Sequence, residues 1–224
     1  DRLVQHFARA IRAAGGRVLS GAPVSGIARV AAGWQVTAQG ESHNAAQLVN
    51  AAGAWADGVA AMAGVPPIGI TPLRRSVARI PAPGGHDVSR WPMLLGTGES
   101  WYAKPDAGQL IVSPAEEDPV DAPHDAWPED LTLAEGIDRY QRVVTEEVTR
   151  LTSSWAGLRS FAPDRALVLG PDPSEPSFVW SAGQGGYGFQ TAPAASRLVA
   201  DLVGGRAPVL DAALVGALSP ARFR

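Results

Sequence analysis

A glycine-rich stretch, residues 183–190, has the residue types of a ligand-binding loop. Its sequence is Gly-Gln-Gly-Gly-Tyr-Gly-Phe-Gln, and it lies between the apolar run 178–180 and a segment of helical spacing, 195–203. A strand, a glycine loop and a helix start in this order expose backbone N–H groups, and the missing Cβ atoms let a ligand come close. We therefore predict an anion- or oxygen-binding loop; the alternative is a glycine-rich turn that only ends a strand.

The same loop has the spacing G-x-G-x-x-G at Gly183, Gly185 and Gly188. A dinucleotide-binding fingerprint with this spacing opens a βαβ unit and has an acidic residue about 20 positions further on. Here Pro208 interrupts the segment that follows, so we do not assign the loop to that class. A free-standing phosphate loop in a nucleotide-binding module remains an alternative.

Arg159 is the side chain best suited to bind an anion. It follows the apolar residues 155–158, so we expect it on a largely buried element, where an unpaired guanidinium is costly. Its partner would be a ligand carboxylate, which a guanidinium binds through two parallel hydrogen bonds, or Asp164 in an internal ion pair. Arg74 and Arg75 begin a sheet strand beside the proposed cleft, and we predict that they form a solvated pair.

The residue types give little indication of a metal site or of a catalytic nucleophile. The chain contains no cysteine, which excludes disulfides, thiolate metal ligands, cysteine nucleophiles and a cysteinyl link to a cofactor. The four histidines share no spacing: His6, His43, His86 and His124. We assign none of them to a catalytic base, and we predict no metal site.

The composition is that of a globular protein, because hydrophobic residues make up 46% of the 224 positions and charged residues 18%. The net charge is −3, without the basic stripe that nucleic-acid binding requires. No apolar run approaches the ~20 residues of a membrane span and no signal peptide is visible, so we expect a cytoplasmic protein. The chain begins without methionine inside a predicted helix, which suggests a preceding segment.

Hydrophobic spacing predicts α/β structure in the first 66 residues. Apolar residues at helical intervals indicate an amphipathic helix over 3–14 that ends at Gly15 and Gly16. A short strand is expected at 17–20. The further elements predicted in this part are strands at 24–30, 33–38 and 47–50 and a helix at 54–63.

Beyond residue 66, two-residue periodicity predicts an antiparallel sheet. The strands are expected at 73–80, 92–95, 100–104 and 109–113, with a hairpin turn at 105–108. The Pro- and acid-rich residues 113–130 indicate a surface loop. A helix is predicted from residue 131 to about 151, with Thr132 and Glu135 at the spacing of a capping box.

Three motifs in this order carry a family resemblance: residues 50–57 (Asn-Ala-Ala-Gly-Ala-Trp-Ala-Asp), residues 155–159 (Trp-Ala-Gly-Leu-Arg) with Pro163, Asp164 and Gly170 after them, and the 183–193 loop. Together they resemble the FAD-dependent glycine oxidase/D-amino-acid oxidase (DAO) family, which includes D-amino-acid dehydrogenases and sarcosine oxidases. The resemblance covers nearly the whole chain. It corresponds to the C-terminal three-fifths or so of such an enzyme, without the N-terminal strand, G-x-G-x-x-G turn and helix.

The resemblance implies a mixed α/β fold (α+β) with two domains. Residues 1–66 and 160–224 would form the remainder of a Rossmann-like FAD-binding domain. Residues 67–159 would form a substrate-binding domain, an antiparallel sheet capped by a helix. Without the N-terminal motif, we expect weak FAD affinity from this chain alone.

FAD is the implied cofactor. Val24 resembles the position whose backbone meets the adenine, and Ala51, Gly53 and Trp55 resemble the turn on the ribityl and pyrophosphate region; packing alone is the alternative for Trp55. The residues implied to face the pyrimidine edge of the flavin are those of the glycine loop and helix start: Gly183, Gly185, Gly186, Tyr187, Gly188, Phe189 and Gln190. A helix N-terminus there would stabilise the negative charge of a reduced flavin.

The resemblance also implies that Arg159 binds the carboxylate of an amino-acid substrate. Tyr102 matches a strand position that puts a phenol into the substrate pocket, with a half-exposed sheet aromatic as the alternative. Gly186 falls where some relatives carry a second arginine. The implied reaction is oxidation of the C–N bond of an amino acid or secondary amine by hydride transfer to FAD, followed by hydrolysis of the imine. The alternatives are a catalytically silent fragment that needs a separate N-terminal segment, and the nucleotide-binding module.

Overall fold

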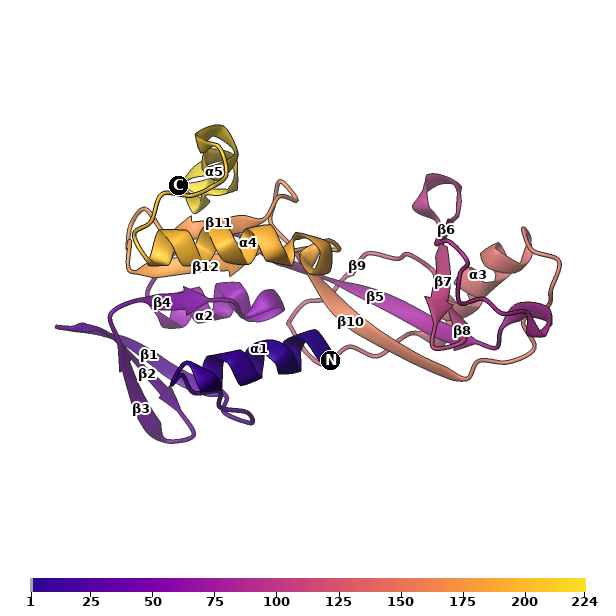
Figure 1. Cartoon of the computed structure of the whole chain (residues 1–224), viewed down its shortest axis with the longest axis horizontal. Helices are drawn as coiled ribbons and strands as arrows, with labels where there is room; N and C mark the ends of the chain where they lie inside the picture. Colours follow the sequence, from indigo (N-terminus) through magenta and orange to yellow (C-terminus); the bar gives the residue numbers. More distant parts are fainter. Residues whose placement is uncertain (1) are drawn as a thin grey trace.

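The computed structural model describes residues 2–224 and shows a mixed α/β protein drawn out along one axis (Figure 1). The mixed α/β class predicted from the sequence is confirmed. In the described part the α-helices are α1 (Arg2–Ala13), α2 (Ala56–Met62), α3 (Asp130–Gln141), α4 (Gly188–Val203) and α5 (Ala212–Leu218). Short 3-10 turns are η1 (Gly53–Trp55), η2 (Pro83–Gly85), η3 (Thr97–Glu99) and η4 (Pro220–Phe223).

The strands of residues 2–224 form three separate sheets. The first contains β1 (Val24–Val30), β2 (Gly33–Ala38) and β3 (Glu41–Ala45). The second has the order β10 (Ser153–Phe161), β5 (Thr71–Ile80), β8 (Gln109–Ser113), β7 (Tyr102–Asp106), β6 (Leu94–Leu95), with β9 (Asp118–Pro119) also on β5. The third has the order β11 (Val168–Pro171), β12 (Phe178–Ala182), β4 (Leu48–Asn50).

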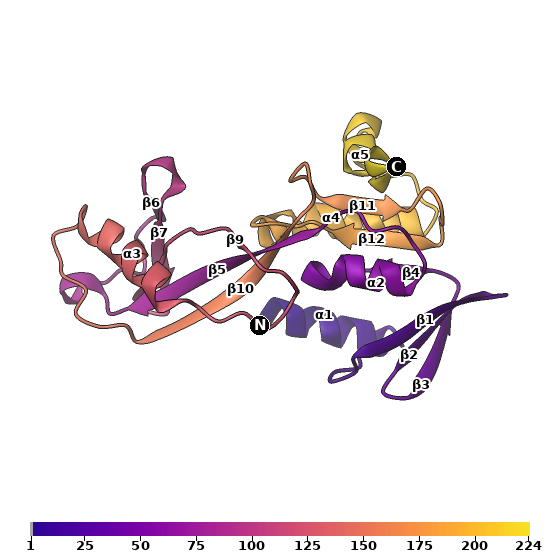
Figure 2. The ribbon, with the colours of Figure 1, turned by 180° about the vertical axis from the view of Figure 1, so that it is seen from behind.

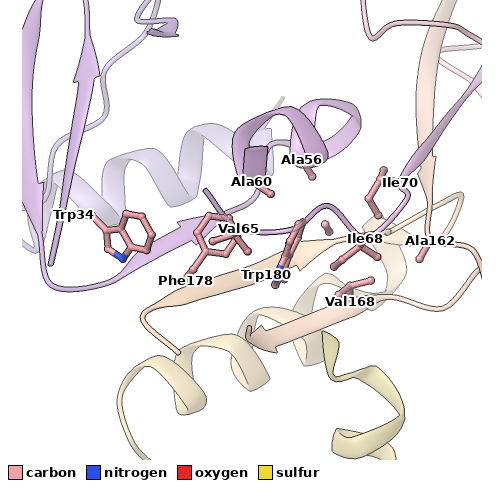
Figure 3. Close-up of a cluster of buried hydrophobic side chains, with 11 residues drawn as sticks. Trp34, Ala56, Ala60, Val65, Ile68, Ile70, Ala162, Val168, Phe178 and Trp180 are labelled. Carbon is pink, nitrogen blue, oxygen red and sulfur yellow. The ribbon is translucent and has the colours of Figure 1, made fainter. Parts of the chain in front are cut away.

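The third sheet holds the main hydrophobic core, with α4 packed along β11 and β12 (Figure 2). Phe178 and Trp180 are fully buried on β12 and lie with Trp34 and Val168 in one cluster (Figure 3). The indole nitrogens of both tryptophans are satisfied, since that of Trp34 donates to the Ser177 hydroxyl and that of Trp180 to Asp172. Burying large aromatic rings with their polar atoms paired fixes the arrangement of this sheet.

Strands β5 and β10 form a long antiparallel ribbon that joins the two ends of the molecule (Figure 1). One end of the ribbon lies beside β12 and α4, and the other carries β8, β7 and β6. Helix α3 packs on this second sheet, where Tyr140 and Trp101 are buried edge to face. The ribbon therefore carries side chains from the outer sheet to the edge of the third sheet.

Several predicted elements differ from the structure. Residues 17–20 do not pair as a strand. The helix predicted to reach residue 151 ends at Gln141, before the β-branched residues 143–145, and the side chain of Gln141 accepts from the backbone N–H of Val148. The predicted capping box is not formed, because the N-cap of α3 is Glu129.

The helix predicted at 195–203 begins earlier, at Gly188. Pro193 lies inside α4 beyond its first four residues, so the helix lacks the hydrogen bond that an N–H at this position would donate to the carbonyl of Phe189. Strand β3 and helix α5 were not predicted. The apolar side chains whose spacing predicts the first helix are exposed in α1: Leu3, Val4, Phe7 and Ile11.

Candidate functional site

The three sequence motifs meet at the end of β10. Ser160 accepts a hydrogen bond at its carbonyl from the backbone N–H of Gly185 in the glycine loop, with an N···O distance of 2.8 Å. A Cβ placed on Gly53, in the motif at residues 50–57, would lie 3.9 Å from the Ser160 hydroxyl oxygen. Arg159 directly precedes Ser160. Segments more than 100 positions apart along the chain thus meet around one residue.

Sheet topology explains this meeting. β4 and β12 are adjacent and parallel, with Asn50 opposite Trp180, so the turns that follow them leave the sheet at the same edge. Ligands of α/β proteins bind outside the carboxyl ends of parallel strands. The turn at residues 51–55 and the loop at 183–188 occupy that edge.

The glycine loop depends on its glycines for both conformation and space. Gly183 and Gly185 have φ of +71° and +53°, in the left-handed region that other residues avoid. A Cβ on Gly185 would lie 2.6 Å from the Phe161 ring. Helix α4 begins immediately afterwards, with no side-chain cap on its N-cap Tyr187 and no acidic residue in its first turn. No side chain therefore caps the first backbone N–H groups of α4.

Asn50 holds the other turn together. Its buried side-chain amide donates to the carbonyl of Ala56 at 2.8 Å and accepts from the backbone N–H of Ala52 at 3.3 Å. The small residues of the motif do not reveal this positioning role of Asn50. Its signal is an asparagine at the end of a strand, because such side chains bond to the backbone two residues on. Ala51 is exposed, and Trp55 is 49% exposed, so Trp55 is not simply a core residue.

A cavity of about 820 Å³ brings together Arg159, Tyr102 and part of the glycine loop. The predicted residues that line it are Tyr102, Arg159, Gly186, Tyr187, Phe189 and Gln190. A Cβ on Gly186 would lie 2.7 Å from Nη1 of Arg159, so this glycine makes room for the guanidinium.

The other predicted cofactor residues lie elsewhere. Gly53 and Trp55 line a separate cavity of about 580 Å³, with Trp127, Leu158 and Ser160. Val24 is at the exposed start of β1 and lines neither of these two cavities. Ala51, Gly183, Gly185 and Gly188 shape the turns and line neither cavity.

The surroundings of Arg159 correct two expectations. Its strand is not largely buried, since Trp155 is 39% exposed and Gly157 is exposed. Asp164 does not pair with Arg159 but forms an ion pair of 2.7 Å with Arg222. Arg159 itself is half-buried. Within residues 2–224, no carboxylate lies at ion-pair distance from it.

The neighbouring arginines also correct the sequence interpretation. Arg74 and Arg75 are not solvated, because their side chains are only 15% and 11% exposed. Arg74 pairs with Asp118 and Glu129, on one face of β5. Arg75 lies on the other face and lines the cavity of Arg159. Neighbouring residues of a strand point to opposite faces, so the two arginines are separated.

Acidic residues from the predicted surface loop 113–130 also lie beside the cavity. Glu117 accepts from Arg75 at 3.2 Å and from Arg165 at 2.8 and 2.9 Å. Burial raises the pKa of Glu116, whose carboxylate accepts from the backbone N–H of Ser76. These contacts were missed because the loop was interpreted from its composition alone.

Within residues 2–224, no group of three or more His, Asp or Glu side chains is placed to hold a metal ion. No helix in the same range is both long and apolar enough to pass through a bilayer.

Comparison with solved structures first defines the fold class. Glycine oxidase from Geobacillus kaustophilus superposes with a TM-score of 0.82 at 22% identity, covering 99% of this chain and 58% of that chain. L-proline dehydrogenase from P. horikoshii superposes with a TM-score of 0.80 at 22% identity, covering 98% of this chain and 58% of that chain. The chain therefore has the fold of these two enzymes over their shared length.

Sequence comparison then gives the family. The model described as DAO, FAD dependent oxidoreductase, matches residues 1–202, and the chain belongs to this family. FAD-dependent oxidoreductase domain-containing protein 1 of Bos taurus is 31% identical over 171 residues, 70% of this chain and 35% of its own length. Hydrogen cyanide synthase subunit HcnC of Pseudomonas aeruginosa is 29% identical over 177 residues, 76% of this chain and 40% of its own length. The chain thus spans well under half of these relatives.

Proposed function

We propose that this chain supplies the substrate-carboxylate site and one side of the flavin site of an enzyme that oxidises a C–N bond in an amino acid or secondary amine. The observation that carries the proposal is the position of Arg159. Its guanidinium lacks a carboxylate partner within residues 2–224 and lies against Gly186, at the start of the loop that leads into α4. Membership of the FAD-dependent oxidoreductase family supports the cofactor class.

The residues at the sheet edge fit a flavin. Gly183 and Gly185 have left-handed backbone conformations, and without Cβ atoms at these positions a ligand can approach the backbone of the 183–188 loop. The uncapped start of α4 offers N–H groups and the positive end of a 16-residue helix dipole. We assign to FAD the residues of this loop and helix start, together with Val24, Ala51, Gly53 and Trp55. When bound, FAD supplies the hydride acceptor for C–N bond oxidation.

Arg159 holds the substrate by its carboxylate in this proposal. The planar guanidinium can form two parallel hydrogen bonds with a carboxylate, which fixes both distance and orientation. Tyr102, on the same cavity, offers a phenol hydroxyl to the polar part of the substrate. The amine of the substrate must be unprotonated when the Cα–H bond is oxidised. The reaction needs no protein nucleophile.

We also propose the division into a cofactor domain, residues 1–66 and 160–224, and a substrate domain, residues 67–159. The β5–β10 ribbon crosses between the two, which supports a site at their junction. A small-molecule amino acid or amine is the proposed partner, and the choice between oxidase and dehydrogenase follows from the electron acceptor.

Arg159→Lys tests the proposal in protein supplied with excess FAD, because weak FAD affinity is expected from this chain alone. Lysine keeps the charge but loses the fork, so kcat/KM for a carboxylated amine should fall roughly 10- to 100-fold. The matched decarboxylated amine should be nearly unaffected, and flavin absorbance and melting temperature should be unchanged. Equal losses on both substrates would make Arg159 a structural residue. A protein without flavin absorbance that binds ADP tightly would instead support a nucleotide-binding module.

A further inference from the structure

Arg75 is a second guanidinium in the cavity of Arg159, and its side chain is only 11% exposed. Arg75 lies opposite Gly157 and Arg159 lies opposite Leu73 in the β5–β10 ribbon. The two arginines therefore project from the same face at diagonal positions, which are about 7–8 Å apart in an antiparallel pair. The Nε of Arg75 donates to the carbonyl of Glu116 at 2.7 Å, so the backbone fixes the direction of its guanidinium.

The charge of Arg75 is poorly neutralised by the protein. Its carboxylate contact is a single hydrogen bond of 3.2 Å to Glu117. Glu117 gives both oxygens to Arg165, at 2.8 and 2.9 Å, so it is shared unequally between two guanidinium groups. Burial and then the nearby charge of Arg159 lower the pKa of Arg75. A buried cation in the field of a second cation gains most from an added anion.

The charged residues that line the cavity are the cations Arg75, Lys104, Arg159 and Arg165 and the acids Glu99 and Glu117. Positive charge is therefore in excess before any substrate enters. One carboxylate on Arg159 leaves Arg75 with the shared Glu117 as its only carboxylate partner within residues 2–224. Arg75 lines the same cavity.

We infer that this cavity takes an amino or imino acid with two carboxylates, the first bound by Arg159 and the second by Arg75. The inference rests on the proposed function, from which it takes the amine and the first carboxylate. The two arginines could each bind one carboxylate, or both could bind the same carboxylate. Their diagonal spacing favours the first arrangement. The hydrogen bond from Arg75 Nε to the Glu116 carbonyl also favours it, because this bond holds the Arg75 side chain in place. Arg75 is then a specificity-determining residue, and a short diacid is the substrate class.

The test compares diacids with their monoacid counterparts in the FAD-loaded protein. The pairs are iminodiacetate with sarcosine, and racemic glutamate with racemic norvaline, which replaces the side-chain carboxylate by a methyl group. Both kcat/KM and calorimetric dissociation constants are measured for the unchanged protein, Arg75→Gln and Arg159→Lys. The monoacids serve as internal controls because they present no group to Arg75.

We expect the unchanged protein to favour each diacid over its monoacid. Arg75→Gln should weaken diacids roughly 10- to 100-fold, the range of a lost charge-assisted hydrogen bond, and leave monoacids within about twofold. Arg159→Lys should weaken both kinds. Equal losses of diacid and monoacid in Arg75→Gln would show a clamp on one carboxylate and overturn the inference. The absence of any diacid preference in the unchanged protein would overturn it too.

Two further measurements keep the outcome decisive. If Arg75→Gln fails to fold, Arg75→Lys and Glu117→Gln replace it: the lysine should retain part of the diacid preference, and removal of the competing Glu117 carboxylate should increase it. No change of preference in either variant would refute the role of Arg75. Turnover of monoacids and diacids without preference would leave the proposed function standing and refute this inference. Selective diacid binding that depends on Arg75, without turnover, would refute the proposed function and leave the anion site standing.

Discussion

The guanidinium of Arg159 occupies space that Gly186 leaves open. With Nη1 only 2.7 Å from the place a Cβ would take, even alanine at position 186 forces the arginine to move. The neighbouring Gly185 makes a different demand, because its φ is +53° and its missing Cβ avoids a buried aromatic ring. At the scale of single residues, two adjacent glycines thus serve two purposes, one for the ligand site and one for the loop itself.

Gly186→Ala should impair substrate binding without weakening the fold. The atom in the way is the far end of a flexible side chain, so the guanidinium can swing aside at little cost in stability. Misplacement of a substrate anchor should raise KM for a carboxylated substrate roughly 10- to 100-fold. Steady-state kinetics and a thermal melt of the FAD-loaded variant measure the two effects.

Gly185→Ala is the matched control and should do the reverse. The added methyl group meets the Phe161 ring at 2.6 Å in a left-handed backbone, so the free energy of unfolding should fall by about 1–3 kcal/mol. If Gly186→Ala destabilised the protein as much as Gly185→Ala, the proposed separation of roles would be wrong.

At the scale of elements, the motif at residues 50–57 is a self-supporting turn that also fixes the next segment. Asn50 holds the turn at one end, and Asp57 in the first turn of α2 reaches across to the segment before β5. Its carboxylate accepts backbone N–H groups from Ile68 at 3.0 Å, Gly69 at 2.8 Å and Ile70 at 2.7 Å. One side chain thereby ties α2 to the entry of the long ribbon.

Asp57→Ala should lower the free energy of unfolding by about 3 kcal/mol, because three backbone donors lose a charged acceptor. Asp57→Asn, which keeps one acceptor oxygen, should lose less. Chemical denaturation of both variants measures the difference. Unchanged stability of Asp57→Ala would mean that water replaces the carboxylate without cost.

At the scale of the whole molecule, contacts between distant segments hold the third sheet to the connection that leaves it. Asp172 is fully buried after β11 and accepts hydrogen bonds from Trp180, Ser174 and Arg224. Arg224 also donates to the carbonyl of Pro67, 157 positions away. Burial opposes the charge of Asp172, but the hydrogen bonds outweigh it, so the pKa is lowered from its ordinary value of 3.8.

This lowered pKa predicts a pH dependence of stability. Because the folded-state pKa lies below the unfolded one, the carboxylate stabilises the fold above about pH 4, and this contribution disappears as the pH falls through the folded-state value. Asp172→Asn should cost about 3 kcal/mol at neutral pH, since it leaves Arg224 without its partner. Its melting temperature should also depend less on pH below 4. The prediction would be contradicted if the melting temperatures of both proteins changed with pH by the same amount between pH 2 and pH 7.

The sequence alone determined the local chemistry. Its three motifs led to the family, and the patterning predicted most strands together with the hairpin between β7 and β8, because turn residues and two-residue periodicity act over a few positions. It also singled out Arg159, Tyr102 and the glycine loop, part of which shares one cavity with these two side chains. The roles of these residues toward FAD and substrate stay predictions.

Only the tertiary structure decided which charges meet. Asp164 pairs with Arg222 across 58 positions, and Arg75 shares Glu117 with Arg165, although local composition suggested an Arg159 pair and a solvated arginine. Strand register settles such questions, because a shift of one residue would place Arg74 instead of Arg75 on the cavity face. Register is set by long-range packing of whole strands, and no short stretch of sequence contains that information.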